Sequence, residues 1–97
     1  MYASIIQAQV PSDKVEAAAQ LWQETIANNP PVGWQEGYLV ADRGSGQVHA
    51  VALWDTETNA KAYESSGRFQ QDVQQFARHL TSPPSRSTGD VLAQGRR

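Results

Sequence analysis

Alternating apolar and polar side chains predict four β-strands in this chain of 97 residues. The strands are expected at residues 2–10, 34–42, 47–54 and 86–93, and the glycines of "RGSG" allow a tight turn between the second and the third. Apolar residues three and four positions apart predict two helices, one between "PSD" and "NNPP" and one from Asp55 or Thr56 to Leu80. The order is β-α-β-β-α-β, which is typical of a ferredoxin-like α+β sandwich with one antiparallel sheet and both helices on one face.

Each helix carries a signal for where it starts or breaks. In the first, Ser12 or Asp13 is expected to cap the free backbone N–H groups, and Glu16 is expected to complete a capping box. The apolar stripe of this helix is expected to comprise Val15, Ala19, Trp22 and Ile26. In the second helix, the stretch "ESSGR" interrupts the apolar pattern, so we expect a kink or break near Gly67.

The two central strands are apolar on both faces. Along the third strand, Val48, Ala50, Ala52 and Trp54 share one face, and His49, Val51 and Leu53 share the other. Residues 38–41 repeat this pattern. Two helices cover only one face of the sheet, and a face in contact with water would carry polar side chains instead. We therefore expect the open face to be buried in a homodimer, with sheet packed on sheet.

Composition narrows the classes of function. Eight basic and ten acidic residues give a formal net charge of −2, which provides no electrostatic basis for binding nucleic acid or an anionic membrane. The third strand also lacks the aromatic residues on which an RNA-recognition module stacks bases. The chain has no cysteine, and its first ten residues show neither a signal peptide nor a membrane span. We expect a cytoplasmic protein with one domain at residues 1–94 and a loose tail at residues 95–97.

Three stretches resemble the antibiotic-biosynthesis-monooxygenase-like branch of the dimeric α/β-barrel superfamily. They are "VPSDKVEAAAQLW", "PVGWQEGYLVADRGSGQVHAVALW" and "LWDTETNAKAYESS". The first is similar to the family's proline-led start of helix one, the second to its Gly-aromatic-x-x-Gly strand and hairpin, and the third to its strand-ending Trp and Ala-rich second helix. The resemblance implies a dimeric barrel with a ligand cleft between sheet and helices in each subunit. It says less about the reaction, because the superfamily includes quinol and anthrone oxygenases as well as heme proteins.

Heme degradation by the superfamily's route is disfavoured by the residues present. The heme-degrading members that the chain resembles use a second-helix histidine as the iron ligand, about ten residues after the position of Tyr63, where this chain has Val73. They also use an asparagine on the first strand, where this chain has Ile5 and Gln7. Valine cannot replace an imidazole on iron, and His79 lies off the apolar stripe of its helix.

Other metal chemistry has little support either. The only histidines are His49 and His79, and no cluster of acidic residues and histidines has the spacing of metal ligands. Asp72 and His79 are two turns apart on a helix, and we expect them to form a solvated pair. We therefore expect a protein with no cofactor and no metal.

The resemblance leaves cofactor-free oxygenation of small planar aromatic molecules as the candidate reaction. Some relatives oxidise phenols or anthrones with O₂, because the carbanion of the substrate supplies the electrons. Such a site needs a base or hydrogen-bond donor in a dry apolar cleft. The candidate catalytic residues are Tyr63 and His49, and the candidate substrate-binding walls are Trp54 and Trp34.

Each candidate residue has a structural alternative. Trp54 can simply anchor the turn from strand to helix in the core, and Tyr63 can place its hydroxyl in a buried hydrogen bond. The parity of the strand puts His49 on the face opposite Trp54, where it would meet the dimer interface rather than the cleft. A non-catalytic ligand-binding or structural dimer is therefore the alternative to a monooxygenase.

Overall fold

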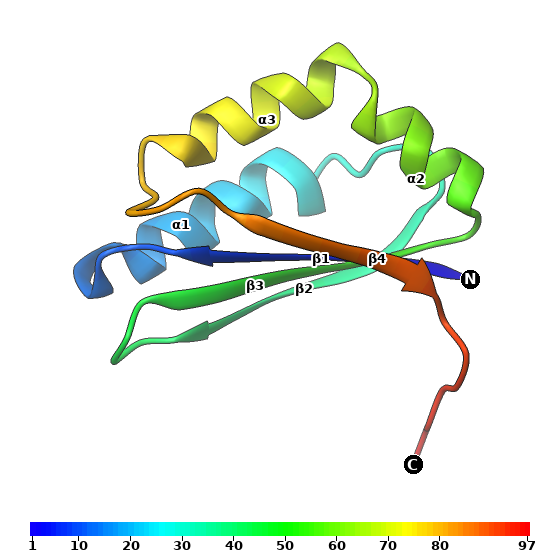
Figure 1. Ribbon diagram of the computed structural model, residues 1–97, viewed down its shortest axis with the longest axis horizontal. Helices are drawn as coiled ribbons and strands as arrows, with labels where there is room; N and C mark the ends of the chain where they lie inside the picture. Colours follow the sequence, from blue (N-terminus) through cyan, green and yellow to red (C-terminus); the bar gives the residue numbers. More distant parts are fainter.

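Helices cover one face of a four-stranded sheet in the computed structural model, which describes residues 1–97 (Figure 1). The strands are β1 (Tyr2–Gln9), β2 (Trp34–Asp42), β3 (Gln47–Trp54) and β4 (Ser85–Asp90), and they pair in the order β2-β3-β1-β4 with every pair antiparallel. The helices are α1 (Val15–Trp22), α2 (Glu57–Glu64) and α3 (Gly67–Ala77), and no helix is long and apolar enough to cross a membrane. This order and topology confirm the predicted ferredoxin-like α+β fold.

The first helix starts differently from the prediction. The expected caps, Ser12 and Asp13, form no cap hydrogen bond. Instead, the backbone N–H of Lys14 donates to the carbonyl of Pro11 at 2.8 Å and closes a 3-10 turn before α1. Glu16 forms no capping box, and its carboxylate pairs with an arginine of the β2–β3 turn at 2.5 Å. The side-chain caps are absent because the backbone itself supplies a partner for a free N–H group.

The buried stripe of α1 is also shifted by one position. Val15, Ala18 and Trp22 are buried, whereas Ala19, which was expected on the stripe, is only half-buried. Spacings of three and four residues keep the three buried side chains on one line along the helix. A π-helical segment at Gln23–Ala27 continues α1 toward the prolines that end it.

The predicted break near Gly67 is confirmed. Helix α2 ends at Glu64, and α3 begins at Gly67 after two non-helical residues. The hydroxyl of Ser66 joins the two helices, because it accepts from the backbone N–H of Phe69 at 3.2 Å and donates to the carbonyl of Tyr63 at 2.5 Å. The break sets α3 at an angle to α2 along the sheet (Figure 1).

A β-bulge near the start of β2 determines which way Trp34 points. Trp34 is paired with Trp54 and Glu36 with Leu53, so one residue of β2 lies between two successive pairs without a partner. The extra residue shifts the alternation, and Trp34 faces the helices although strict alternation would place it on the outer face. The indole ring lies over Gly37, where a larger side chain would collide with it.

The last strand is shorter than expected. It ends at Asp90 rather than at residue 93. Asp90 is paired with Tyr2, the first residue of β1, and no other strand lies beside β4, so the residues after Asp90 have no strand to pair with. Residues 91–97 then leave the sheet on the side away from the helices (Figure 1).

The buried core consists of two small clusters at opposite ends of the helix-covered face. One contains Val10, Val15, Ala18 and Val48, and the other contains Tyr2, Trp54 and Ala60. Only ten of the 97 residues are buried, because the space between the clusters is not filled by side chains. The two layers therefore enclose a cavity, which is the candidate site described below.

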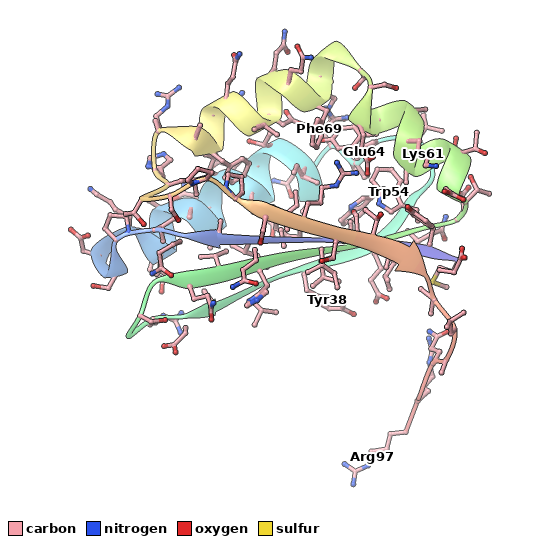
Figure 2. The ribbon with its side chains drawn as sticks, in the orientation of Figure 1. Tyr38, Trp54, Lys61, Glu64, Phe69 and Arg97 are labelled. Atoms are coloured by element: carbon pink, nitrogen blue, oxygen red, sulfur yellow. The ribbon has the colours of Figure 1, made fainter.

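The opposite face of the sheet carries apolar side chains with nothing over them. Figure 2 shows Tyr38 on this outer face and Trp54 on the face that the helices cover. Tyr38 is 51 % exposed, Val40 is 55 % exposed and Ile5 is 39 % exposed, whereas Trp54 is 2 % exposed. The structure thus has the apolar outer face that the sequence predicted.

Candidate functional site

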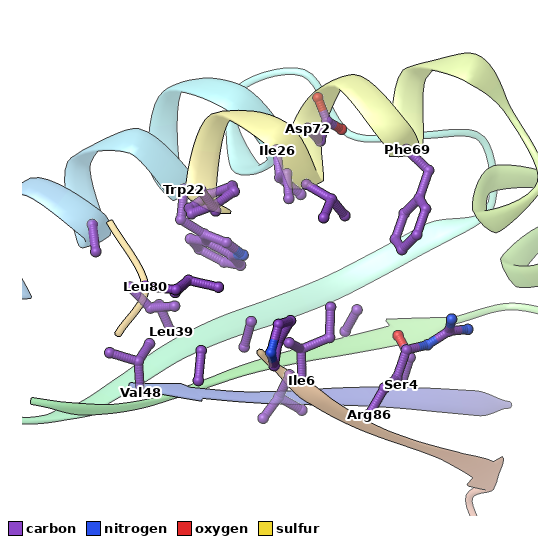
Figure 3. A pocket seen from close by; sticks show the side chains of 18 of the residues that line it. Ser4, Ile6, Trp22, Ile26, Leu39, Val48, Phe69, Asp72, Leu80 and Arg86 are labelled. Atoms are coloured by element: carbon purple, nitrogen blue, oxygen red, sulfur yellow. The ribbon is translucent and has the colours of Figure 1, made fainter. Parts of the chain in front are cut away.

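The candidate site is a cavity of about 350 Å³ between the sheet and the helices. Its floor is formed by the helix-facing side chains of the strands, and its roof by α1, α3 and the end of α2 (Figure 3). Aromatic side chains make up much of the wall: Trp22, Trp34, Trp54, Tyr63, Phe69 and Phe76. A volume of this size is typical of sites that hold small organic molecules.

Three of the aromatic rings form one continuous wall. The rings of Trp54 and Tyr63 lie 5.6 Å apart between centroids at an angle of 34°, and Phe69 meets Tyr63 edge-on at 5.3 Å. Trp34, which is paired with Trp54, lies 6.4 Å from Trp22 between ring centroids. Aromatic pairs at these distances stabilise one another beyond the area that they bury, so the wall has a fixed shape.

The polar groups of the cavity are few, and one of them is deeply buried. Asp72 on α3 is 6 % exposed, and its Oδ2 accepts a hydrogen bond from the hydroxyl of Tyr63 at 2.5 Å. Burial and the neighbouring carboxylate of Asp72 together raise the pKa of Tyr63 well above its ordinary value. Tyr63 is therefore a neutral hydroxyl group whose hydrogen is directed at Asp72.

The expected solvated pair of Asp72 and His79 is wrong. Asp72 is buried because Tyr63 and Arg68 both contact its carboxylate, and the Arg68 Nε lies 3.5 Å from Oδ2. His79 is half-buried and lines the cavity near its apolar end. The prediction failed because Tyr63, nine residues earlier, folds back over α3 across the helix break.

The arginines near the cavity are held by protein groups. Arg68 donates to the backbone carbonyls of Thr25, at 3.1 Å, and of Asn29, which ties α3 to the end of α1. Arg86 on β4 forms an ion pair with Glu64 and lies 5.7 Å from the ring centroid of Phe69. Each charged group in the wall therefore has a partner of opposite charge or a carbonyl that accepts from it.

A neutral polar pair lies on the floor of the cavity. The indole N–H of Trp54 donates to the hydroxyl oxygen of Ser4 at 3.2 Å. Ser4 lies on β1 between Tyr2 and Ile6 on the helix-covered face, so its hydroxyl reaches the cavity. Figure 3 shows Ser4 on the sheet and Asp72 on the helix above it, on opposite sides of the cavity.

The structure brings together three of the four residues that the sequence singled out. Tyr63, Trp54 and Trp34 all line the cavity. His49 does not, because it lies on the outer face of the sheet, paired with Gln7 on one side and Val40 on the other. The geometry puts His49 on the outer face and fits both alternatives for Trp54 and Tyr63. Both residues line the cavity, but Trp54 is also buried in the core and the Tyr63 hydroxyl forms a buried hydrogen bond to Asp72.

Sequence reasoning missed Asp72, Ser4 and Arg86 as cavity residues. Two signals point to them: Arg68 and Asp72 are four residues apart on a helix, and Ser4 alternates with the buried Tyr2. Arg86 could not be placed without the register, since it faces the cavity through its pairing with β1.

The position at which the sequence resemblance would put a heme ligand is apolar. Val73 lines the cavity, and no imidazole lies in its place. No group of three or more histidine, cysteine, aspartate or glutamate side chains is arranged to hold a metal ion. The donor set of the cavity therefore does not fit heme bound through the position that the sequence resemblance implies.

The sequence matches no protein-family model and no curated protein, but the fold matches many solved structures. A protein from Nitrosomonas europaea, provisionally named antibiotic biosynthesis monooxygenase, has a TM-score of 0.77 and 17 % identity, over 96 % of this chain and 100 % of its own. A protein from Deinococcus radiodurans with the same provisional name has a TM-score of 0.78 and 12 % identity, over 100 % and 98 % of the two chains.

A third structure, a protein of unknown function from Nitrosomonas europaea, has a TM-score of 0.76 and 15 % identity, over 99 % of this chain and 93 % of its own. The similarity extends over nearly the whole chain in each case, so it concerns the complete arrangement of strands and helices. At these identities it establishes the fold and leaves the reaction to the residues of the cavity. The chain therefore has the α+β ferredoxin-like fold of the antibiotic-biosynthesis-monooxygenase-like proteins.

Proposed function

We propose that the cavity binds a small, flat, largely apolar aromatic molecule and promotes its oxygenation by O₂ without a cofactor. The observation that carries the proposal is an aromatic-walled cavity of about 350 Å³ with the Tyr63–Asp72 hydrogen bond in its roof. The provisional names of the similar structures support the class of reaction.

The reaction suits phenols, quinols and anthrones, because these molecules supply the electrons themselves. Loss of a proton from an activated carbon leaves a carbanion, which transfers electrons to O₂ and forms a C–O bond. Cleavage of the O–O bond leaves one oxygen on the carbon as a carbonyl, and the other leaves as water with the two hydrogens of the original CH₂ group. The overall change is CH₂ + O₂ → C=O + H₂O, which balances without any other reductant.

The protein's part in this reaction is to orient the substrate and exclude water. Trp54 and Trp34, which are paired on adjacent strands, provide neighbouring apolar walls, and Phe69 closes one end. Tyr63 is the proposed contact for the polar group of the substrate, and Asp72 fixes the orientation of its hydroxyl. His49 has no role in this chemistry and belongs to the proposed dimer interface.

Binding and O₂ consumption test the proposal separately. Thermal shift with anthrones, quinols and simple phenols measures binding, because a ligand of the native state raises the melting temperature. An oxygen electrode then measures turnover with each compound that binds, and we expect one O₂ consumed for each carbonyl formed. Tyr63→Phe should reduce turnover about a hundredfold, whereas Tyr38→Phe, the same change on the outer face, should leave it unaltered.

Each result separates the possible functions. Binding without O₂ uptake would replace the oxygenase by the ligand-binding alternative. Failure of every compound to bind would overturn both and favour a purely structural dimer. Equal turnover in the Tyr63→Phe variant would remove Tyr63 from the mechanism.

We also propose that the outer face of the sheet binds a second copy of the chain. Its exposed apolar side chains include Ile5 on β1 and Tyr38 and Val40 on β2, and the half-buried Val51 and Leu53 of β3 lie between these strands on the same face. A continuous apolar surface across a sheet is stabilised by a complementary surface, and a two-fold dimer presents the same one. Sheet-to-sheet packing of two chains would form the barrel that the sequence resemblance implies.

A further inference from the structure

Tyr63 offers the cavity a hydrogen-bond acceptor. A tyrosine hydroxyl has one hydrogen, and here that hydrogen is donated to Asp72 at 2.5 Å. The lone pairs of the Tyr63 oxygen accept no hydrogen bond from the protein. A ligand group that meets this oxygen must therefore donate, as a hydroxyl does and an ether or ketone does not.

Ser4 offers a hydrogen-bond donor on the other side of the cavity. Its oxygen already accepts from the indole N–H of Trp54 at 3.2 Å, and its own hydrogen has no acceptor in the protein. A ligand group that meets Ser4 is therefore satisfied best when it accepts, as a carbonyl does. Figure 3 shows Ser4 on the floor and Asp72 in the roof, so Ser4 and the Tyr63–Asp72 pair come from opposite layers of the cavity.

The charges around the cavity favour a neutral ligand. Glu64 is paired with Arg86, and Asp72 with Arg68, so neither arginine beside the cavity lacks a partner. The remaining basic side chain of the wall, His79, lies beside Leu80, which packs against the core cluster at the end of the cavity away from Tyr63. A ligand carboxylate near Tyr63 would enter an apolar space beside two acidic side chains and would gain no free arginine. The cost of burying that charge would not be offset.

We infer that the cavity selects a neutral, flat hydroxy-carbonyl molecule, with its hydroxyl on Tyr63 and its carbonyl on Ser4. This inference rests on the proposed function, since it names the class of molecule that the same cavity takes. Hydroxylated anthrones and related hydroxy-ketones belong to this class, whereas simple hydrocarbons and aromatic acids do not.

Four small probes test the inference with the native protein. They are a hydroxytetralone with its hydroxyl on the ring edge away from the ketone, its methyl ether, the corresponding tetrahydronaphthol without the ketone, and the carboxytetralone. Quenching of tryptophan fluorescence measures each dissociation constant at about pH 6, where the phenol is neutral. We expect the hydroxytetralone to bind about tenfold more tightly than its ether or the tetrahydronaphthol, and the carboxylate to bind most weakly.

Variants assign each preference to its residue. Tyr63→Phe should bring the hydroxytetralone and its ether to equal affinity, and Ser4→Ala should do the same for the hydroxytetralone and the tetrahydronaphthol. Asp72→Asn should also reduce the preference for hydroxyl over ether, because an amide can donate to Tyr63 as well as accept from it. Each readout is a ratio of two ligands on one folded protein, so a general loss of stability does not change it.

The outcomes separate this inference from the function on which it rests. Equal binding of the hydroxytetralone and its ether to the native protein would overturn the inference and leave a cavity for flat apolar molecules. Tightest binding of the carboxylate would overturn it as well. Failure of all four probes to bind would overturn the proposed function together with it.

Discussion

The two faces of the sheet are apolar in different ways. On the helix-covered face, aromatic rings surround a cavity, and the polar groups of Ser4, Tyr63 and Asp72 are held by hydrogen bonds. On the outer face, Tyr38 and Val40 are about half exposed, and the Tyr38 hydroxyl donates to its neighbour Glu36 at 2.7 Å. Alternate residues of the same strands thus line a cavity on one side and an open apolar surface on the other.

The largest expected difference between the faces is in the stability that is lost when each of two neighbouring residues on β3 is replaced by alanine. Trp54→Ala should lower the free energy of unfolding by about 3–5 kcal/mol, because the indole is buried and its removal enlarges an existing cavity. Leu53→Ala, on the outer face, should lower it by about 1 kcal/mol. Urea denaturation at low protein concentration measures both, since dilution minimises any contribution from a dimer.

Similar losses in the free energy of unfolding for Trp54→Ala and Leu53→Ala would contradict the division into a packed helix-covered face and an open outer face. A large loss for Leu53→Ala that grows with protein concentration would instead show that a partner chain covers Leu53.

A charge placed on the outer face should disrupt the proposed dimer and leave the cavity unchanged. Val40→Asp should raise the dissociation constant of the dimer at least about a hundredfold, because it places a charge within an apolar interface. Sedimentation or light scattering at micromolar concentration should give the mass of a monomer, while the affinity for cavity ligands is retained. Val32→Asp is the matched control, since Val32 is 82 % exposed in the loop before β2. A native protein that is already monomeric would overturn the interface.

The smallest expected effect is on the pH dependence of stability, which should differ between Tyr63 in the cavity and Tyr38 on the outer face. The pKa of Tyr63 is raised by burial and by Asp72, so its contribution to stability is complete below about pH 10, the value in an unfolded chain. That contribution is lost as the pH rises from there through the raised pKa. The difference in urea midpoint between the native protein and Tyr63→Phe should therefore shrink above about pH 10.

Tyr38→Phe is the control for that titration. The pKa of Tyr38 is also raised, first by its hydrogen bond to Glu36, but the side chain lies at the surface and its influence on folding should be slight. Urea midpoints of the native protein and Tyr63→Phe that stay equally far apart at every pH would show that the Asp72 hydrogen bond does not stabilise the fold.

Much of the fold follows from local patterns in the sequence. The break between α2 and α3 was predictable because serine and glycine weaken a helix, and Ser66 also caps the helix that follows. Thr56 caps α2 in the same way, by accepting from the N–H of Asn59 at 3.1 Å. The missing caps of α1 could not be predicted, because the competing 3-10 turn depends on backbone geometry at Pro11.

The site was less predictable than the fold. Aromatic residues such as Tyr63 and Trp54 are recognisable from their periodic spacing, but spacing does not say whether they fill a core or surround a space. Asp72 was misjudged for a related reason, since a polar residue in a glutamine-rich helix resembles a solvated one. Its burial depends on Arg68, four residues earlier on α3, and on Tyr63, whose position relative to Asp72 is fixed only by the angle between α2 and α3.

The bulge at the start of β2 has a consequence for how such a site can evolve. Because Gln35 is unpaired, Trp34 faces the cavity, while Tyr38 and Val40 on the same strand lie on the outer face. Loss of the single codon for Gln35 would leave Trp34 directly before Glu36, so regular alternation would keep the indole of Trp34 on the helix-covered face. The bulge therefore lets β2 gain or lose one residue at this point without moving any other side chain of the strand to the opposite face.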